Sequence, residues 1–430
     1  MFSSNQVNLT NLSVSQLIFL PKPKIENVPL HALDNWLLSD DLSLSHTSGY
    51  FFSTIGCKNI FNGNASVLID QNEVGLLLCF IQSENDKLSL EASIFCSIKF
   101  EPGNDPLYQL SPSIQKTFSN IKGIHGGSKF DFGVYSSFIT HEYYCSLLTE
   151  QSNSFLHKKN LNVAYSVNNK FRADFLSKNP MSLEITIRDL IAYSLLDNCI
   201  HIDLRSSMCT YLCQLYCILN DIFASSIHYD EYLNFFSRLA FERQTPWRFL
   251  KISEFCVYDD FAIVNMETPS RTAQKVVGVS VEVQGREVLS WSQPLIDCTR
   301  STFDLFYSQT RNNLHVLAYA NVGIGSRNEI ELLPYICECE FSRNSLLTFF
   351  SAKLVHSSLQ SEEGGRFYRR HNIHNLYSCT SSEIKPTIDG LDFLWLDVHS
   401  VLYLLKSTQH ISIELRSALY VLFSYLLKEL

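Results

Sequence analysis

The chain repeats itself faintly, and this internal repeat constrains its fold more than any other feature. Two acidic signatures are each followed, at the same spacing, by a phenylalanine and an asparagine: Thr149-Glu150-Gln151 with Phe155 and Asn160, and Ser361-Glu362-Glu363 with Phe367 and Asn372. The segment 202–206 is matched in the same order by 413–417. Loop insertions account for small drifts in the offset. Several matches in one order indicate duplication, and 430 residues suit two domains.

The two halves share an order of secondary structure. Alternating and β-rich stretches predict strands at 50–55, 76–81, 93–100, 276–283 and 314–319. Helical spacing of apolar residues predicts helices at 187–196 and 396–405, and a long helix over 208–248 joining the halves. Strands followed by helices favour an α+β fold. We place the first repeat at 1–225 and the second, more divergent repeat at 226–430.

Charge and hydropathy exclude several classes of protein. The net charge is −9 and the pI about 5.8, and the sequence carries no basic stripe of the kind that nucleic-acid binders present. The first 21 residues lack the features of a signal peptide, and apolar runs stay far below the ~20 residues of a membrane span. We therefore expect a cytoplasmic chain without nucleic-acid or membrane partners. Its 13 cysteines are then expected as thiols.

Five polar segments together carry a family resemblance. They are Glu101-Pro102-Gly103-Asn104, the run 109–120 (QLSPSIQKTFSN), Ile124-His125-Gly126-Gly127, the Trp-Ser-Gln-Pro run at 291–294, and 360–368 (QSEEGGRFY). In these segments the chain resembles the NDP-hexose 2,3-dehydratase family, and the resemblance extends over about 28–422. It implies a tandem repeat of two Nudix-like α/β sandwich domains in a homodimer. It also implies a dTDP-linked 4-keto-6-deoxyhexose as substrate, with no metal and no cofactor.

Some positions depart from the family pattern. Residues 64–67 (NASV) stand where the first repeat should have its own Trp-x-Gln-Pro, and 323–326 (GIGS) stand where the second should have Glu-Pro-Gly-Asn. The metal-binding glutamates of a Nudix hydrolase box are also missing after Arg286-Glu287-Val288. Two interpretations stay open: an active dehydratase, or a catalytically degenerate paralogue that binds a nucleotide sugar.

The implied reaction determines which groups to seek. A 4-keto group acidifies the C-3 proton, and the resulting enolate can expel the C-2 hydroxyl. The product is a 3,4-diketo-2,6-dideoxy sugar, which a downstream 3-ketoreductase would consume. No electrons are transferred, so the protein needs only a base, an acid and donors for the enolate oxygen.

Three residues are candidates for proton transfer. Glu101 is a candidate base, presented by the Pro-Gly turn that follows it. Glu150, in the first acidic signature, is a competing base, and the sequence does not choose between them. His125 is a candidate acid or phosphate ligand because histidine titrates near neutral pH.

Neutral and basic side chains complete the expected substrate site. Alternate polar residues in 109–119 would line one face of a single strand and face the sugar. The candidates for substrate binding are Asn104, Gln109, Ser111, Gln115, Thr117, Ser119, Asn120, Lys158, Lys159, Asn160, Trp291, Gln293, Glu362, Arg366 and Tyr368. Among these, Arg366 suits phosphate, since guanidinium binds it bidentately. Trp291 and Tyr368 could stack on the nucleotide base.

Two further groups have a simpler interpretation. Cys209, Cys213 and Cys217 share one apolar helix face and are expected to be buried thiols. His371 and His374 could form a metal pair, but no third ligand is evident, so we expect no metal site.

Overall fold

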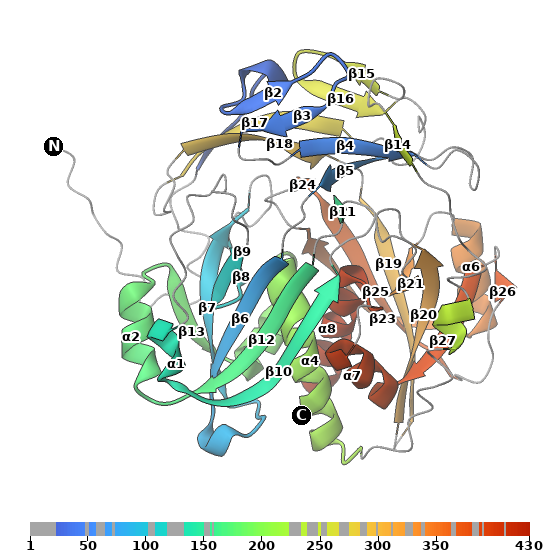
Figure 1. The fold of residues 1–430 in the computed structure, drawn as a ribbon. Coiled ribbons are helices and arrows are strands. Elements are labelled where there is room, and N and C mark those ends of the chain that lie inside the picture. Colours follow the sequence, from blue (N-terminus) through green and yellow to red (C-terminus); the bar gives the residue numbers. More distant parts are fainter. Residues whose placement is uncertain are drawn as a thin grey trace.

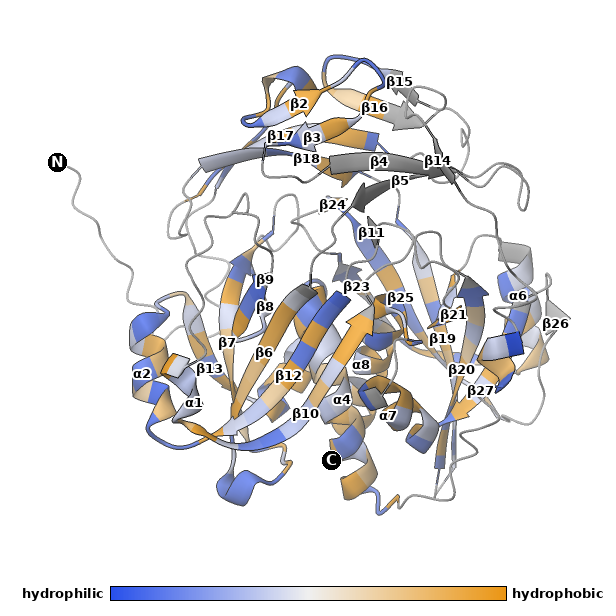
Figure 2. Ribbon diagram, viewed as in Figure 1, coloured by the Kyte–Doolittle hydropathy of each residue, from blue (hydrophilic) through white to orange (hydrophobic). Residues whose placement is uncertain are grey.

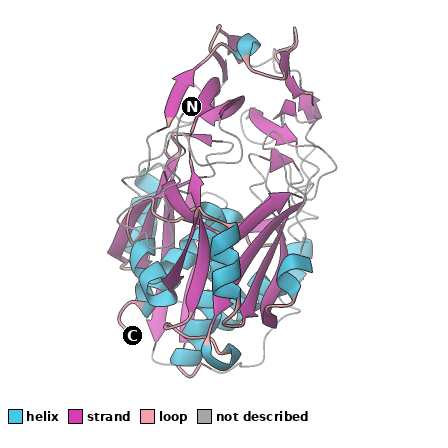
Figure 3. Ribbon diagram, turned by 90° about the vertical axis from the view of Figure 1, so that its left-hand side faces the viewer, coloured by secondary structure: helices cyan, strands magenta, loops and turns pink. Residues whose placement is uncertain are grey.

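Two large sheets flank a central pair of helices, and two small sheets lie above them (Figure 1). Figure 3 shows that the helices gather in the lower part, whereas the upper part consists mainly of strands. This computed structural model describes residues 23–47, 51–56, 65–70, 74–101, 108–117, 133–149, 155–156, 159–222, 234–238, 248–250, 256–265, 275–283, 290–297, 300–310, 313–322, 330–336, 340–362, 367–380, 387–388, 391–407 and 410–430. The mixture of sheets and helices confirms the α+β class.

The first large sheet has the strand order β10-β12-β6-β7-β13, with β8 paired to β7 and β9 to β6. Its strands are β6 (Val74–Gln82), β7 (Ser93–Phe100), β8 (Tyr108–Ser111), β9 (Ile114–Thr117), β10 (Ile139–Thr149), β12 (Lys159–Val167) and β13 (Ser182–Thr186). Strands β12 and β6 are parallel, whereas β10 and β7 run antiparallel to their neighbours. Helices α1 (Gly133–Ser136), α2 (Phe171–Lys178) and α3 (Ile187–Ser194) belong to this half.

The second large sheet repeats this pattern in the order β23-β25-β19-β20-β27-β26, with β21 paired to β20 and β22 to β19. Its strands are β19 (Thr302–Thr310), β20 (Asn313–Val322), β21 (Ile330–Leu333), β22 (Tyr335–Ile336), β23 (Lys353–Ser361), β25 (His371–Ser378), β26 (Thr387–Ile388) and β27 (Leu391–Asp397). Again one pair, β19 with β25, is parallel. Helices α6 (Glu340–Phe349) and α7 (Val398–Ser407) accompany it. The shared order and strand directions support the duplication inferred from sequence.

The small sheets exchange strands between the two halves. One contains β2 (Trp36–Leu38), β3 (Leu44–His46), β4 (Phe51–Gly56), β5 (Ala65–Asp70), β11 (Phe155–Leu156) and, from beyond residue 225, β14 (Arg248–Leu250). The other contains β15 (Cys256–Tyr258), β16 (Ala262–Asn265), β17 (Lys275–Glu282), β18 (Ser290–Asp297), β24 (Phe367–Tyr368) and, from the start of the chain, β1 (Lys24–Asn27). The predicted division at 225 and 226 stays a prediction, and one strand crosses it in each direction.

Two capped helices occupy the centre of the molecule. Helix α4 (Ile202–Leu219) begins after His201, whose ring accepts a hydrogen bond from a backbone N–H of the first turn. Helix α8 (Ile413–Leu427) begins after Ser412, whose hydroxyl accepts from Leu415 N. Ser is a common N-cap because its oxygen satisfies a backbone donor that the helix leaves unpaired. The predicted helix over 208–248 is wrong in extent, because α4 begins at Ile202 and ends at Leu219 and Arg248 already belongs to a strand. Within the predicted range, 234–238 are helical as well.

Reciprocal arginine contacts hold α4 and α8 together. Arg205 donates from Nε to Ser417 Oγ at 2.7 Å, and Arg416 donates from Nε to Ser206 Oγ at the same distance. Arg205-Ser206 and Arg416-Ser417 end the matching segments 202–206 and 413–417, and we call these two pairs the repeated Arg-Ser signature. Apolar residues of both helices lie in one hydrophobic core that spans both repeats, and Figure 2 shows the hydrophobic colour along much of the central helices. In the part of the chain that the structure describes, no helix has the length and apolarity to cross a membrane.

The exchange of β1 can be tested at one glycine of β17. Val28 N donates to Gly278 O at 3.0 Å, and a Cβ built on Gly278 would lie 2.2 Å from Val28 O. We predict that Gly278→Ala lowers the free energy of unfolding by about 1–3 kcal/mol, because the backbone of the segment after β1 must move away. Chemical denaturation measures this change, and hydrogen exchange at Ile25 measures whether β1 detaches. The control is Ser280→Ala on the same strand, and equal effects of both variants would contradict the close approach.

Candidate active site

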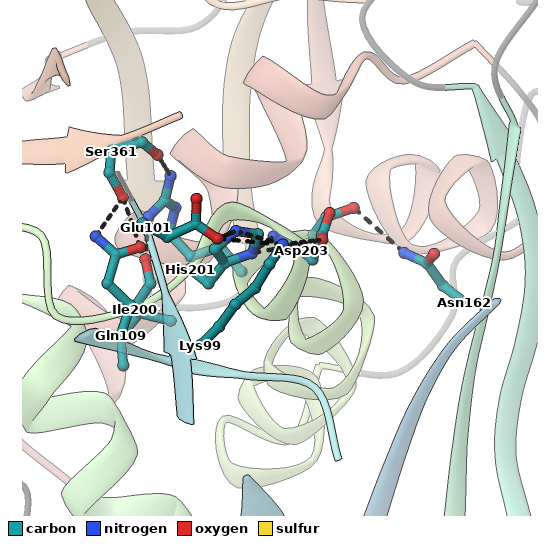
Figure 4. Close-up of polar contacts among 10 residues, drawn as sticks. Lys99, Glu101, Gln109, Asn162, Ile200, His201, Asp203 and Ser361 are labelled. Atoms are coloured by element: carbon teal, nitrogen blue, oxygen red, sulfur yellow. Dashed lines mark hydrogen bonds and ion pairs between the residues drawn. The ribbon is translucent and has the colours of Figure 1, made fainter. Parts of the chain in front are cut away.

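Four charged or titratable side chains converge where β7 meets the start of α4. We call Lys99, Glu101, His201 and Asp203 the Glu101 cluster (Figure 4). His201 Nε2 lies 2.9 Å from Glu101 Oε1, and Lys99 Nζ lies 3.2 Å from the same oxygen. Asp203 Oδ2 lies 3.9 Å from Lys99 Nζ and 3.4 Å from His201 Nδ1. Glu101 is completely buried, so its charge depends on these partners.

The helix cap determines which nitrogen of His201 carries the proton. Asp203 N donates to His201 Nδ1 at 3.1 Å, so this nitrogen acts as an acceptor. In a neutral imidazole the other nitrogen then carries the hydrogen. His201 Nε2 lies 2.9 Å from Glu101 Oε1 and 3.2 Å from Lys99 Nζ. The imidazole thus faces the buried carboxylate and the ammonium group of Lys99 together.

Strand pairing brings the cluster together from positions a hundred residues apart. Strand β8 pairs with β7 so that Tyr108 lies opposite Phe100, the residue before Glu101. On its other side Leu110 accepts a hydrogen bond from His201 N at 2.8 Å. Strand β8 thus lies between the end of β7 and the start of α4, and fixes their separation. In the second repeat, Leu332 accepts from Ser412 N at 3.1 Å in the same way.

The second repeat contacts this site through Gln109 and Ser361. Gln109 Nε2 and Ser361 Oγ lie 2.7 Å apart, and Ser361 Oγ lies 2.9 Å from Gln109 Oε1. Both side chains are buried, and a buried polar group needs a hydrogen-bond partner, so each depends on the other. Gln109 was predicted to bind sugar. In the structure it joins β8 of the first repeat to β23 of the second.

The Trp-Ser-Gln-Pro segment lies on β18, above the end of β7. Trp291 is buried and its ring meets that of Phe100 edge-on, with centroids 6.2 Å apart. Gln293 is also buried. Strand pairing confirms the alignment of the repeats, since Ile69 is opposite Phe155 and Ile296 is opposite Phe367, which puts 291–294 in the place of 64–67. Only the second repeat therefore supplies a tryptophan at this position.

The prediction of one continuous polar strand over 109–119 is wrong. The chain leaves β8 after Ser111 and begins β9 at Ile114, so these residues belong to two strands that pair with different neighbours. Ser113, between them, accepts a hydrogen bond from Phe80 N and donates to the Phe95 carbonyl. It satisfies the backbone where β6 and β7 separate. Ser111 is buried and Gln115 is partly buried, so the alternation reflects the division of the sheet, and the ligand face stays a prediction.

Several predicted site residues lie outside the described residues. They are Asn104, Ser119, Asn120, His125, Glu150, Lys158 and Arg366, and only the backbone of Thr117, in β9, is described. Their assignments stay predictions.

The remaining predicted residues lie on strands of both repeats. Lys159 and Asn160 begin β12, and Asn160 packs so closely on β6 that a Cβ on Gly75 would lie 2.0 Å from its Oδ1. Tyr368 is buried in β24, and the Arg369 guanidinium lies 4.6 Å from its ring centroid.

Glu362 belongs to a second acidic group. It is buried and accepts a hydrogen bond from Asn372 Nδ2. Burial, and then the nearby charge of Glu362, raise the pKa of Glu414 in α8. Glu414 occupies in α8 the position that Asp203 occupies in α4.

The cysteines and the histidine pair behave as the simpler interpretation predicted. Cys209, Cys213 and Cys217 are buried in α4, and burial is the main cause that raises the pKa of the Cys209 thiol. His371 and His374 are three apart on β25, so their side chains point to opposite faces of the sheet. His371 Nδ1 lies 3.1 Å from Asn198 Oδ1, and His374 packs edge-on against the Phe303 ring. They form no pair.

Sequence reasoning missed Lys99, His201 and Asp203. Two signals could have found them. Lys99 alternates with Glu101 on one strand, so both side chains leave the same face. His201 and Asp203 directly precede the repeated Arg-Ser signature, at the start of a helix where acidic and capping residues gather.

A buried carboxylate close to an imidazole and an ammonium group is a candidate site for acid–base chemistry on a duplicated α+β fold. A model of one family, described as NDP-hexose 2,3-dehydratase, matches residues 21–210 and 259–422. The chain belongs to this family, which confirms the resemblance and the predicted class of enzyme, a hydro-lyase.

Three relatives carry the same name, dTDP-4-dehydro-6-deoxy-alpha-D-glucopyranose 2,3-dehydratase. The protein from Streptomyces violaceoruber is 26% identical over 88% of this chain and 88% of its own length. That from Saccharopolyspora spinosa is 24% identical over 91% of this chain and 86% of its own. That from Amycolatopsis orientalis is 25% identical over 80% and 75%. The similarity thus extends over both repeats.

The two roles of His201, helix cap and donor to Glu101, can be separated by substitution. In α8 a serine performs the capping role, so His201→Ser should keep the cap while removing the donor. His201→Ala should remove both, and we predict that its free energy of unfolding lies about 1 kcal/mol below that of His201→Ser. Chemical denaturation of both variants measures the difference. Equal stabilities would show that a capping side chain at position 201 does not stabilise α4.

Proposed function

We propose that this protein removes the C-2 hydroxyl from dTDP-4-keto-6-deoxy-D-glucose, the compound that the names of its three relatives specify for them. The observation that carries the proposal is the Glu101 cluster. It lies where the family's Glu-Pro-Gly-Asn segment leaves β7, and it pairs a buried carboxylate with a proton donor and a cation. An elimination next to a ketone needs these groups.

The proposed reaction assigns a role to each member of the cluster. Glu101 takes the proton from C-3, and the released electron pair forms the enolate between C-3 and C-4. The enolate then expels the C-2 oxygen, which leaves as water after it accepts a proton. The resulting enol tautomerises to the 3,4-diketo sugar. Lys99 Nζ and His201 Nε2 lie within 3.2 Å of Glu101 Oε1, where they can hold the carboxylate in place for this step.

Glu150 remains the competing base, and His125 remains a candidate acid. The Asp203 carboxylate lies 3.9 Å from Lys99 Nζ, and we assign it no proton-transfer step. We also propose that each repeat is a Nudix-like sandwich, supported by the mixed sheet that recurs with one parallel pair at its centre. The homodimer, the downstream 3-ketoreductase and the cytoplasmic location stay predictions.

The second candidate function, a silent nucleotide-sugar binder, is favoured by one feature of the second repeat. Pairing of β20 with β21 puts Val322 in the place of Phe100, so Gly323 follows where the first repeat has Glu101. The second repeat therefore lacks the carboxylate of the Glu101 cluster. We favour the dehydratase because the first repeat has the whole cluster.

The test is incubation of the purified protein with dTDP-4-keto-6-deoxy-D-glucose, a 3-ketoreductase and NADPH, followed by mass spectrometry. The reductase traps the unstable diketo product. We expect a product one oxygen lighter than the 2-hydroxylated control. Tight dTDP binding without this product would favour the silent binder.

Substitution of the two carboxylates identifies the base. We predict that Glu101→Gln lowers kcat by about 100- to 10,000-fold, the usual range for loss of a general base. Glu150→Gln serves as the matched variant under the same assay. A normal rate for Glu101→Gln together with a lost rate for Glu150→Gln would transfer the role to Glu150.

A further inference from the structure

Arg205 is completely buried between the two repeats and contacts both. Its Nη2 donates to the Ser361 carbonyl at 2.6 Å, and its Nη1 donates to Gln360 Oε1 at 3.1 Å and to the Ile200 carbonyl. Its Nε donates to Ser417 Oγ. One guanidinium therefore fixes the start of α4, the end of β23 and the first turn of α8.

Two of these partners are adjacent to the Glu101 cluster. Ile200 is the residue before His201, and its carbonyl belongs to the peptide bond that supplies His201 N. Ser361 is the residue whose hydroxyl meets Gln109 on β8. Through these two contacts Arg205 fixes both sides of the segment from which His201 reaches Glu101 (Figure 4).

We propose that Arg205 is a positioning residue for the dehydration: by holding the Ile200 and Ser361 carbonyls, it sets where His201 Nε2 lies against Glu101 Oε1. The active site of the first repeat is then complete only when β23 of the second repeat is in place. This inference rests on the proposed function for its kinetic consequence. Its structural consequence, the orientation of His201, does not depend on the substrate.

The geometry of the guanidinium makes the proposal specific. Its planar fork carries donors on three separate nitrogen atoms, whereas the ammonium group of lysine has all its donors on one. Arg205→Lys keeps the buried positive charge near Asp203 and Glu362, both of which interact electrostatically with Arg205. It loses the simultaneous hold on the Ile200 and Ser361 carbonyls. The substitution therefore tests geometry apart from charge.

The repeat supplies a matched control. Arg416 donates from Nε to Ser206 Oγ at 2.7 Å and from Nη1 to the Ile411 carbonyl at 2.5 Å. Ile411 precedes Ser412, which caps α8 with a hydroxyl. Arg416→Lys thus disturbs an equivalent buried contact at a helix start that carries no imidazole. Both variants should lose similar stability in thermal unfolding.

The kinetic test uses full-length Arg205→Lys and Arg416→Lys in the coupled dehydratase assay. For Arg205→Lys we expect kcat to fall by about 10- to 100-fold, the cost of displacing a reacting group by roughly 1 Å, with KM nearly unchanged. Arg416→Lys should keep a kcat near that of the wild type. Equal losses of kcat in the two variants, or none in either, would overturn the proposal.

A second readout does not require turnover. Nitrogen NMR of histidine-labelled protein reports the tautomer of each imidazole, and His201→Ser identifies the His201 signal. We expect the Nε2–H form in the wild type and in Arg416→Lys, and a mixture of tautomers in Arg205→Lys. An unchanged His201 signal in Arg205→Lys would overturn the proposal. A wild type without turnover would instead refute the proposed function. The NMR comparison would then still test whether Arg205 positions His201.

A milder pair of variants covers the case in which Arg205→Lys does not fold. Ser417→Ala removes one acceptor of Arg205, and Ser206→Ala removes the equivalent acceptor of Arg416. We expect Ser417→Ala to lower kcat more than Ser206→Ala does. The reverse order would overturn the proposal.

Discussion

The reciprocal hydrogen bonds between Arg205 and Ser417, and between Arg416 and Ser206, are the contact on which the rest of the structure depends. A buried guanidinium is costly unless each donor finds an acceptor. Burial lowers the pKa of Arg205 to about 10, so it remains charged at neutral pH. Because the helices must align for both arginines to be satisfied, this contact fixes the relation of the two repeats.

The two copies of the fold differ at the starts of α4 and α8. In the first repeat the helix start carries His201, which meets Glu101. In the second it carries Ser412, and Gly323 stands where the carboxylate would be. The second repeat instead supplies Ser361 and Trp291 to the neighbourhood of the Glu101 cluster. One copy thus has the Glu101 cluster, and the other supplies side chains that pack on the strands beside it.

The fold was predictable where local patterns decide it. Alternation predicted β7 at 93–100 with its exact bounds, and helical spacing predicted α3 at 187–196 within two residues of its end. Repeated spacing predicted the duplication. The exchange of strands was not predictable. Strand β1 pairs with β17, which lies about 250 residues farther along the chain, and such distant pairing leaves no local signal. The long helix over 208–248 failed because apolar spacing continues past Leu219, where the helix ends.

The candidate site was likewise predictable only where a local motif marks its residues. Glu101 was found through its motif, but the partners that give it chemistry come from a distant helix cap, and caps are identified only once the helix start is known. Gln109 was predicted to face the sugar, and that role stays a prediction. The structure adds Ser361 as its hydrogen-bond partner, which the sequence could not show because a polar side chain facing another repeat has the same pattern as one facing a ligand.

The exchange of β1 also has a consequence during synthesis. Strand β1 leaves the ribosome early, but its partner β17 follows about 250 residues later. At usual rates of translation this delay is on the order of ten seconds or more. For that time β1 waits without the strand that it pairs with in the finished fold. The sheet that contains β1 is therefore completed only after more than half of the chain has been made.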